Sequence, residues 1–482
     1  MDMLIGGTRI GGTRIGGTNW IDVINPATGE WIDRVPAAGE AELELALQSA
    51  QEGFAEWSAM TVFQRNQILY RYAALVEEHR EELQLLLCQE NGKNIKNTAM
   101  EFDAVHALFT GYAEKAAHLC GSTLPSGNQM TSAREDLVFT RWEPLGVVAC
   151  FIPFNFPVDL YAEKAAPALA AGNAVIIKPP TDCPLTVMRL VALLHEAGVP
   201  PKAAQVVTGR GGTVGDKLIA DPRVAAISLT GSTEVGAAAY QKASPNLTRV
   251  FLELGGNDAF IVNGDADIDL AVSEAIFGRM GNCGQTCCAS KRFIVHRSVE
   301  REFTDKLIAQ LKQIKLGDPQ NPELDEGCMI SPEAAGHVVE QIQHTQRQGA
   351  VCALGGERYD RVYVQPTVLT GVTAEMDIAS DLEIFGPVFP IIPFDTQEEA
   401  IKIANQSCYG LMGAVFSRNL QTAMTMASQM QCGGVVINGA SDFRSSEMPF
   451  GGYKKSGLGR EGILHTLCEM MQEKSYVLKQ VF

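Results

Sequence analysis

The sequence has little of what metal, membrane and nucleic-acid proteins require. Its 12 cysteines and 8 histidines are scattered, with no Cys-x-x-Cys pair and no cluster at zinc-ligand spacing. No apolar run approaches the roughly 18–20 residues that span a bilayer. No basic run offsets the formal net charge of -17. We therefore expect no metal site, no nucleic-acid partner and no membrane association.

We also expect no signal peptide, because no charged segment precedes an apolar core and a cleavage site. The 12 cysteines in so long a chain predict free thiols in a reducing cytoplasm rather than a disulfide framework. Near the N-terminus, the segment Ile5-Gly-Gly-Thr-Arg9 recurs at 10–14 and nearly again at 15–19. We interpret it as a duplicated strand or turn, and not as a phosphate-binding loop, because no helical pattern follows it directly.

Hydrophobic residues make up 46% of the chain and charged residues 20%, which is typical of a globular protein. Helical periodicity is present at 41–57, 65–91 and 99–119. From residue 146 apolar strands alternate with helices; the strands are expected at 147–152, 174–178, 205–207, 224–229 and 249–252, and the helices at 157–171, 185–198, 213–220 and 233–242. This alternation predicts a parallel, doubly wound sheet.

A second α/β region is expected at about 255–434, with strands such as 292–296 and 388–393. The tail 474–482 has the pattern of an edge strand that could pair with another segment or subunit. The sequence thus predicts two doubly wound α/β domains and a separate terminal strand.

The most informative segment is Gly281-Asn-Cys-Gly-Gln-Thr-Cys-Cys-Ala-Ser290, a turn between a helical and a strand pattern. Such a turn makes Cys287 accessible, although a free cysteine considered alone is more often an inert buried thiol. Glu253 and Asn155 each follow an apolar strand. Either could be merely structural, as a solvated carboxylate or a capping amide. Ligands of doubly wound sheets, however, collect at the carboxyl ends of the strands.

Together these three residues suit one two-stage reaction. Attack of a Cys287 thiolate on an aldehyde creates an oxyanion, which the Asn155 side-chain amide and the Cys287 backbone N–H could stabilise. Hydride departure to a nicotinamide would leave a thioester. Glu253 could then activate the water that hydrolyses this thioester.

The signals for a dinucleotide are weaker. The segments Thr208-Gly-Arg-Gly-Gly-Thr-Val-Gly215 and Thr230-Gly-Ser-Thr-Glu-Val-Gly236 are Gly-rich turns before helices, which suits pyrophosphate oxygens. Neither is the usual G-x-G-x-x-G pattern. Lys178, before Pro-Pro-Thr181, places a cation after a strand, where it could meet a ribose or a 2′-phosphate.

These motifs resemble those of the aldehyde dehydrogenase superfamily, from Asn25-Pro-Ala-Thr-Gly-Glu30 to Lys455-Ser-Gly-Leu-Gly-Arg-Glu461. The most specific matches are Leu252-Glu-Leu-Gly-Gly256 and Gly284-Gln-Thr-Cys287, which carry the expected base and nucleophile. Further matches are Pro153-Phe-Asn-Phe-Pro157, Glu383-Ile-Phe-Gly-Pro387 and Pro449-Phe-Gly-Gly452.

The resemblance implies an NAD(P)-dependent enzyme in which Cys287 is the nucleophile, Glu253 the general base and Asn155 the oxyanion donor. Lys178 and Glu383 would hold the cofactor riboses, Gly231 and Ser232 the pyrophosphate, and Phe385 the nicotinamide. Other expected cofactor contacts are Ile152, Pro153, Phe154, Thr181, Gly209, Gly215 and Leu254. Expected substrate contacts are Glu163, Thr286, Cys288, Arg444 and, at the substrate funnel, Phe450.

The same resemblance implies three parts. A dinucleotide-binding domain is expected at 1–125 and 144–253, and a catalytic domain at 254–455. A small β arm at 126–143 and 470–482 would join subunits into a homodimer or homotetramer.

Three departures bear on the choice of cofactor and substrate. Thr181 replaces a glutamate that, in many relatives, binds the adenosine ribose and repels a 2′-phosphate, so we expect NADP to be accepted beside NAD. Thr286 and Glu163 replace arginines of the glyceraldehyde-3-phosphate and succinic-semialdehyde branches. We therefore expect a small, polar, uncharged aldehyde; a small semialdehyde held by Arg444 is the main rival.

Two other classes of function remain open from the sequence. A CoA-acylating dehydrogenase generally lacks a base such as Glu253, and a cofactor-free thiol esterase would not need the residues on the cofactor side. A non-enzymatic structural protein on the same fold would not need an intact set of Cys287, Glu253 and Asn155.

Overall fold

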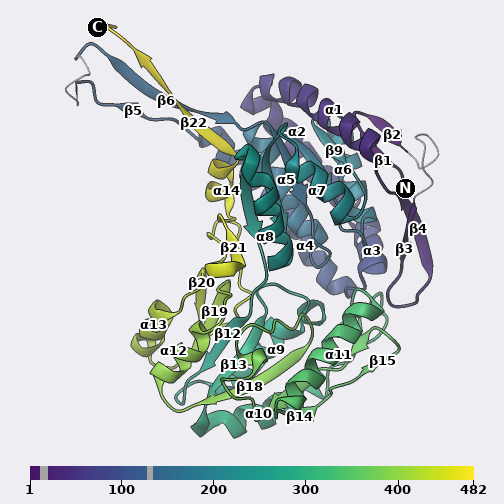
Figure 1. Cartoon of the computed structure of the whole chain (residues 1–482), viewed down its shortest axis with the longest axis vertical. Helices are drawn as coiled ribbons and strands as arrows, with labels where there is room; N and C mark the ends of the chain where they lie inside the picture. The colour runs from purple at the N-terminus through teal and green to yellow at the C-terminus, as the bar shows by residue number, and fades with distance from the viewer. Residues whose placement is uncertain (11–19, 128–133, 482) are drawn as a thin grey trace.

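The computed structural model describes residues 1–10, 20–127 and 134–481, which form two α/β bodies and a projecting arm (Figure 1). The first body contains an eight-stranded sheet in the order β2-β1-β9-β8-β7-β10-β11-β21. Its strands are β1 (Met3–Ile5), β2 (Thr8–Ile10), β7 (Val147–Phe151), β8 (Ala174–Lys178), β9 (Ala204–Val206), β10 (Val224–Thr230), β11 (Arg249–Glu253) and β21 (Gly457–Leu458). The five central strands are parallel, whereas β1 and β21 pair antiparallel to β9 and β11.

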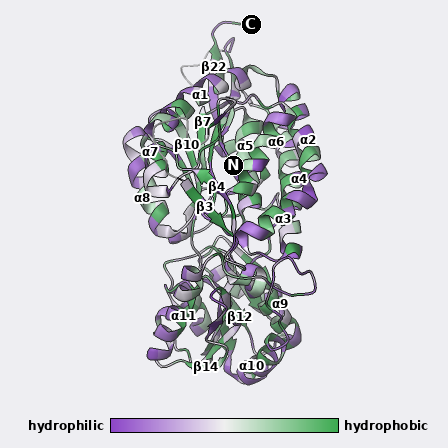
Figure 2. Ribbon diagram, turned by 90° about the vertical axis from the view of Figure 1, so that its right-hand side faces the viewer, coloured by the Kyte–Doolittle hydropathy of each residue, from purple (hydrophilic) through white to green (hydrophobic). Residues whose placement is uncertain are grey.

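Helices cover both faces of this sheet (Figure 2). Because successive residues of a strand point to opposite faces, Val148 and Cys150 of β7 join one hydrophobic core, and Val147 and Ala149 join the other. The first core is completed by α2 (Val62–Glu78), α3 (Arg80–Asn91), α4 (Ile95–His118), α5 (Pro157–Ala171), α6 (Leu185–Ala197) and α14 (Ile463–Glu469). The second is covered by α1 (Glu40–Ala59), α7 (Asp216–Ala220) and α8 (Thr233–Ala243).

The second body is built on a seven-stranded sheet in the order β14-β17-β18-β13-β12-β19-β20. Its strands are β12 (Asp258–Val262), β13 (Ser290–His296), β14 (Val351–Leu354), β17 (Thr367–Thr370), β18 (Val388–Phe394), β19 (Met412–Phe416) and β20 (Gly434–Ile437). Its helices are α9 (Ile268–Met280), α10 (Arg297–Leu311), α11 (Pro332–Arg347), α12 (Gln397–Asn405) and α13 (Leu420–Gln429). The predicted pair of doubly wound sheets is confirmed.

The arm is a three-stranded sheet that leaves the first body (Figure 1). Its strands are β5 (Thr123–Leu124), β6 (Leu137–Pro144) and β22 (Met471–Leu478). Strand β22 pairs antiparallel with β6 along its whole length. The expected terminal strand therefore exists, and it finds its partner within the chain.

Two segments differ from the sequence prediction. The expected helix at 65–91 is wrong as a single element: α2 ends at Glu78 and α3 begins at Arg80, with His79 (φ -99°, ψ 9°) outside the helical region. Both helices bury one face in the same core, so the apolar period continues across the break. The expected helix at 213–220 begins instead as a π-helical turn (Gly211–Gly215) and becomes α-helical only at Asp216.

The first copy of the N-terminal repeat forms a hairpin at the edge of the first sheet. Strand β1 pairs with β2, and Gly6 and Gly7 turn the chain at φ values of 57° and 84°, a region that glycine adopts without a steric penalty. The other two copies lie outside the described residues. Two further hairpins complete the chain, β3 (Trp20–Ile24) with β4 (Trp31–Pro36) and β15 (Arg358–Tyr359) with β16 (Tyr363–Val364). Of the helices described, none combines the length and apolarity needed to cross a bilayer.

Candidate active site

The turn between α9 and β13 carries Cys287. Asn282 and Cys283 adopt left-handed conformations (φ 53° and 55°), and Gly284 follows at φ 75°. A Cβ at Gly284 would lie 2.5 Å from the backbone of Gly386, so only glycine fits there. This tight turn brings Cys287, which is half-buried, to the wall of a cavity of about 400 Å³.

The two adjacent cysteines differ in their ionisation. The Cys288 thiol donates to the Cys287 sulfur and, with the cations of Lys291 and Arg444, holds the pKa of Cys287 below its usual value despite burial. The pKa of Cys288 is raised well above its usual value, by that same hydrogen bond and by burial. A lower pKa means more thiolate, which is the nucleophilic form. The geometry therefore favours Cys287 over Cys288 as the reactive thiol.

Glu253 is the last residue of β11, and its side chain is buried. Its carbonyl accepts a hydrogen bond from Gly231 N at 3.1 Å, whereas its Oε1 atom has no hydrogen-bond partner among the described residues. Burial raises the pKa of Glu253 well above its usual value, and the charges of Cys287 and Glu461 raise it further. The carboxylate borders a small cavity of about 20 Å³ that is separate from the large one. An unsatisfied, buried carboxylate that senses the charge of Cys287 is suited to accept a proton.

Asn155 lies in the turn between β7 and α5 and is 4% exposed. Its backbone carbonyl accepts hydrogen bonds from Lys93 Nζ at 2.7 Å and from Asn282 Nδ2 at 2.9 Å. The second bond ties the turn of Asn155 to the turn that presents Cys287. The predicted oxyanion donor and nucleophile thus belong to neighbouring turns that are directly connected.

Arg444 is the one cation among the described residues that line the large cavity. Its guanidinium donates to Glu163 Oε1 at 2.7 Å and to Glu461 Oε2 at 2.6 Å, and it lies 4.5 Å from the ring centre of Phe450. Glu163 and Phe450, both expected to contact substrate, contact Arg444 and are not among the described residues that line this cavity. Thr286 and Cys288 line the cavity directly.

The rest of the cavity wall is mainly apolar. Its apolar residues are Met100, Ala104, Phe156, Leu160, Ile276, Phe277, Met280 and Ile314, and its acidic residues are Glu101, Asp159, Asp325, Glu326 and Asp442. Burial raises the pKa of Asp442 to about 6 and that of Glu326 to about 8. A ligand in this cavity meets apolar side chains and carboxyl groups, and a single arginine whose charge is already engaged.

Lys178 is the last residue of β8, beside the end of β7 in the first sheet. Burial lowers its pKa to about 8, and its ammonium donates to Pro179 O at 3.0 Å. Thr181 is half-buried three residues later. Asp182 and Arg210 lie close enough for their charges to interact, as do Asp182 and Lys178. This region offers two cations and one carboxylate to a ribose or phosphate.

The Gly-rich turns lie where helices begin. Ser232 caps α8, and its hydroxyl accepts from Val235 N at 3.3 Å. The position of Gly231 has open space for a close ligand, since no atom lies within 3.5 Å of a Cβ built there. Gly209 has a φ of 154°, and Gly215 packs beneath Phe151. The N-terminus of α8, with its free N–H groups, is suited to pyrophosphate oxygens.

The remaining predicted cofactor residues surround these turns. Ile152 N donates to Lys178 O at 3.0 Å, and Leu254 N donates to Ser456 O at 2.9 Å. Glu383 Oε1 lies 2.9 Å from Lys291 Nζ and accepts from Gly256 N at 3.3 Å. The ring of Phe385 meets that of Phe154 edge-on, with centres 6.0 Å apart; Pro153 precedes Phe154 in the turn. The carboxylate, the aromatic pair and the Gly-rich turns fit a dinucleotide.

The aldehyde dehydrogenase family pattern matches residues 15–476. The chain is 36% identical over 454 residues to a 3-sulfolactaldehyde dehydrogenase of Pseudomonas putida, covering 94% of this chain and 92% of that relative. It is 35% identical over 462 residues to a lactaldehyde dehydrogenase of Methanococcus vannielii, covering 95% and 97% of the two chains. The chain belongs to the aldehyde dehydrogenase family.

Solved structures of aldehyde dehydrogenases and related enzymes share the whole fold. A point mutant of the Staphylococcus aureus betaine aldehyde dehydrogenase, in complex with NAD+, superposes with a TM-score of 0.94 at 33% identity and covers 99% of this chain and 97% of its own. An NADP-dependent enzyme of Escherichia coli gives a TM-score of 0.95 at 33% identity and covers 99% and 98%. The predicted family, fold and enzyme class are confirmed: the chain is an NAD(P)-dependent aldehyde dehydrogenase.

In this aldehyde dehydrogenase, several residues of the site escaped prediction because their partners are remote in sequence. Lys291 donates to Gly256 O at 2.6 Å and also to the carbonyl of Cys287, which fixes the nucleophile turn. Glu461 pairs with Arg444 and, at 3.2 Å, with Lys164. Arg210 was visible only as one residue of a Gly-rich segment. The available signal was weak: a charged residue within an otherwise apolar or Gly-rich run.

Proposed function

We propose that this enzyme oxidises an aldehyde to a carboxylic acid through a thioester on Cys287. The observation that carries the proposal is the position of Cys287 at the wall of the large cavity, with the buried carboxylate of Glu253 close enough for the two charges to interact. A thiolate and a separate proton acceptor are what acylation and hydrolysis require in turn. Initial rates of NAD(P)H formation over a panel of aldehydes, with NAD and with NADP, test the proposal.

Each residue has one task in this scheme. The Cys287 thiolate attacks the carbonyl carbon, and the side-chain amide of Asn155 and the Cys287 N–H stabilise the oxyanion. A bound nicotinamide would supply the hydride acceptor. Glu253 then removes a proton from the water that attacks the thioester. The carboxylic acid departs, and Cys287 is again a free thiolate.

The residues on the cofactor side support use of both dinucleotides. Lys178 and Glu383 would hold the riboses, Ser232 and the N-terminus of α8 the pyrophosphate, and Phe385 the nicotinamide ring. Thr181 places no charge beside a 2′-phosphate. One similar solved structure contains NAD+, and another belongs to an NADP-dependent enzyme.

Replacement of Thr181 by Glu is expected to shift the cofactor preference toward NAD. A carboxylate there would repel the 2′-phosphate, and an unscreened charge pair near a protein surface is worth about 4 kcal/mol at 4 Å. We expect the ratio of kcat/KM for NADP over NAD to fall at least roughly tenfold, with Thr181→Gln as the uncharged control. A wild-type enzyme without any NADP-dependent rate at saturating aldehyde would contradict this.

The charges of the cavity support an uncharged substrate. Arg444 already donates to Glu163 and Glu461, so it has little charge left for an anionic aldehyde. Among the described residues the wall offers such an anion no further cation, whereas its apolar residues accept a small neutral molecule. A lactaldehyde dehydrogenase is among the similar relatives. A small hydroxyaldehyde therefore suits this site best.

The kcat/KM for lactaldehyde or glyceraldehyde is expected to exceed that for succinic semialdehyde and glyceraldehyde 3-phosphate by roughly tenfold or more, about 1.4 kcal/mol. Arg444→Ala should lower all four values together, because it removes the ion-pair partner of the buried Glu163 and one partner of Glu461, which keeps Lys164. Betaine aldehyde, a cation, serves as the opposite-charge probe. A strong wild-type preference for an anion that collapses selectively in Arg444→Ala would establish Arg444 as an anion clamp and refute the neutral substrate.

The arm supports assembly into a homodimer or homotetramer, with the predicted three-part division of the chain. Its strands lie away from the cores of both bodies (Figure 1), and Leu124, Val477 and Leu478 are exposed. Exposed apolar strands are commonly covered by another subunit. A chain that ends at Met470 is expected to sediment as a monomer, and the full chain as an oligomer. Equal sedimentation of the two chains would contradict this role.

A further inference from the structure

The turn that carries Asn155 is held at its backbone, not at its side chain. Phe154 O accepts a hydrogen bond from Asn91 Nδ2 at 2.6 Å. Asn155 O accepts from both Lys93 Nζ and Asn282 Nδ2. No described residue hydrogen-bonds to the side-chain amide of Asn155, which is therefore available to a ligand, while the peptide behind it is fixed.

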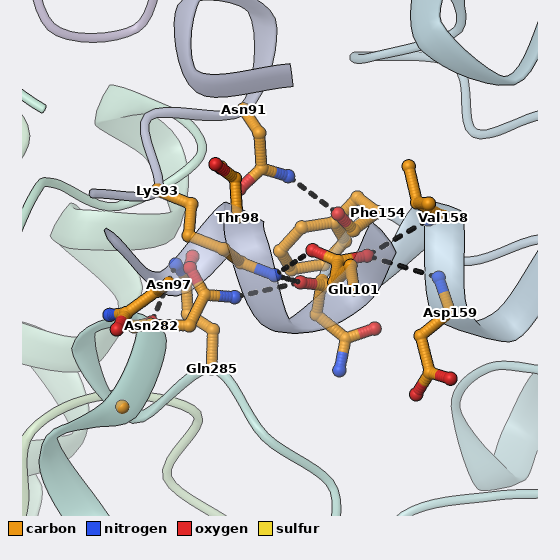
Figure 3. Close-up of polar contacts among 12 residues, drawn as sticks. Asn91, Lys93, Asn97, Thr98, Glu101, Phe154, Val158, Asp159, Asn282 and Gln285 are labelled. Atoms are coloured by element: carbon orange, nitrogen blue, oxygen red, sulfur yellow. Dashed lines mark hydrogen bonds and ion pairs between the residues drawn. The ribbon is translucent and has the colours of Figure 1, made fainter. Parts of the chain in front are cut away.

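Lys93 is the centre of this support (Figure 3). Its side chain is 0% exposed, and its ammonium forms an ion pair with Glu101, donates to Asn155 O, and lies 3.7 Å from the ring centre of Phe156. An ammonium has three N–H donors, and here each faces a carboxylate, a carbonyl or an aromatic ring. A buried charge is retained only where it is paired in this way.

Glu101 extends the support to the next helix. Its second oxygen accepts from Val158 N at 2.9 Å and from Asp159 N at 3.2 Å, at the start of α5 (Figure 3). The N-cap residue Phe156 provides no side-chain cap of its own. Glu101, from α4, therefore caps α5 and, through Lys93, supports the carbonyl of Asn155.

Asn282 connects the same carbonyl to the nucleophile turn. Its left-handed backbone directs Nδ2 to Asn155 O, and its own carbonyl accepts from Gln285 Nε2 at 3.1 Å. Gln285 is in turn fixed by Ile330 N at 3.1 Å. Because the Asn282–Asn155 hydrogen bond joins the two turns, a shift of the Cys287 turn would also shift Asn155.

We propose that Lys93, Glu101 and Asn282 are positioning residues that place the Asn155 amide for oxyanion stabilisation at Cys287. The inference rests on the proposed roles of Asn155 and Cys287. Oxyanion stabilisation depends on donors held within a few tenths of an ångström of the developing charge. If the Asn155 carbonyl lost these hydrogen bonds, the Asn155 amide would lose its placement, whereas the Cys287 thiolate would remain.

The test compares two reactions of Cys287, of which only one forms an oxyanion. Acylation by p-nitrophenyl acetate passes through a tetrahedral oxyanion, with nitrophenolate leaving, and needs no cofactor. Alkylation by iodoacetamide displaces iodide and forms no oxyanion. Lys93→Gln and Asn282→Gly are the test variants; glycine tolerates the left-handed backbone of residue 282. Lys96→Gln, at an exposed lysine of the same segment, is the matched control.

We expect both test variants to acylate roughly 10- to 100-fold more slowly, since loss of a whole oxyanion donor costs about 10²–10³. Alkylation should stay within about twofold of wild type, and Lys96→Gln should leave both rates unchanged. In an Asn155→Ala background, where the supported carbonyl remains but the amide is gone, Lys93→Gln should slow acylation less than about twofold further. Aldehyde oxidation with NAD(P) should follow the acylation rates.

Equal losses in acylation and alkylation would overturn the proposal, because they would indicate general damage to the Cys287 turn. The proposal would also be overturned if Lys93→Gln slowed acylation by the same factor in the Asn155→Ala background as in the wild type. If Lys93→Gln fails to fold, Asn282→Gly decides alone, as it leaves the ion pair intact. Unchanged acylation in Asn155→Ala would instead refute the proposed oxyanion role of Asn155 itself, and the two failures are thereby distinguished.

Discussion

Cys287→Ala is expected to abolish aldehyde oxidation, with a loss of roughly 10⁴-fold or more, whereas Cys288→Ala should keep most of the activity. The reason is the difference in ionisation: Cys287 has the lowered pKa and opens to the cavity, and the pKa of Cys288 is strongly raised. Steady-state rates of NAD(P)H formation in the two variants provide the measurement.

The matched pair also controls for folding, because both changes remove one sulfur from the same turn. The Cys287→Ala variant should still bind NAD(P), which quenching of protein fluorescence would measure. Loss of the Cys288 hydrogen bond removes the largest influence that lowers the pKa of Cys287, so the pH profile of Cys288→Ala should shift to higher pH. An inactive Cys288→Ala beside an active Cys287→Ala would move the nucleophile by one residue.

Glu253→Gln is expected to slow turnover by roughly 10²–10⁴-fold while the first stage of the reaction continues. The amide cannot accept a proton from water, so the acyl group should accumulate on Cys287. A burst of NAD(P)H in a single turnover, followed by detection of the thioester by intact mass, measures this. Steady-state turnover equal to that of wild type would remove Glu253 from the role of base.

The raised pKa of Glu253 also predicts the direction of the pH dependence. A base acts in its deprotonated form, so thioester hydrolysis in the wild type should quicken as the pH rises through the pKa of Glu253. Part of the increase in this pKa comes from the negative charge of Cys287. Acylation removes that charge, so the pKa of Glu253 should be lower in the acyl-enzyme than in the free enzyme. Rapid-mixing rates of deacylation against pH check this relation.

The central elements could be read from the sequence because their signals are local. Helix α5 begins at Pro157 and ends before Gly172, and β8 spans Ala174–Lys178, as the alternation of apolar runs and breakers predicted. Glu253 ends β11, Asn155 follows β7 and Cys287 lies in the turn after α9, and the first parallel sheet brings the ends of β7 and β11 to one edge. The sequence therefore predicts which elements carry these three residues, but not the contacts that each side chain makes.

The partners of these residues were not predictable, because they depend on contacts between distant segments. Arg444 was considered as a free cation for an anionic substrate, yet it pairs with Glu163, 281 residues away. Lys93 hydrogen-bonds to Asn155, 62 residues away, and no sequence motif indicates this contact. A period or a turn signal describes one element at a time, whereas charge pairing depends on how elements pack.

The C-terminal segment has a consequence for how the chain is made. Strand β21 completes the edge of β11, α14 packs on α4 and α5, and β22 covers β6. Thr140 of β6 and its partner Glu473 are 333 residues apart. At about 5–20 residues per second, a ribosome needs roughly 17–67 s to add the strand that pairs with β6. During synthesis β11 of the first sheet and β6 of the arm therefore each wait with an open edge, and the wall around Glu253 is among the later parts of the enzyme to close.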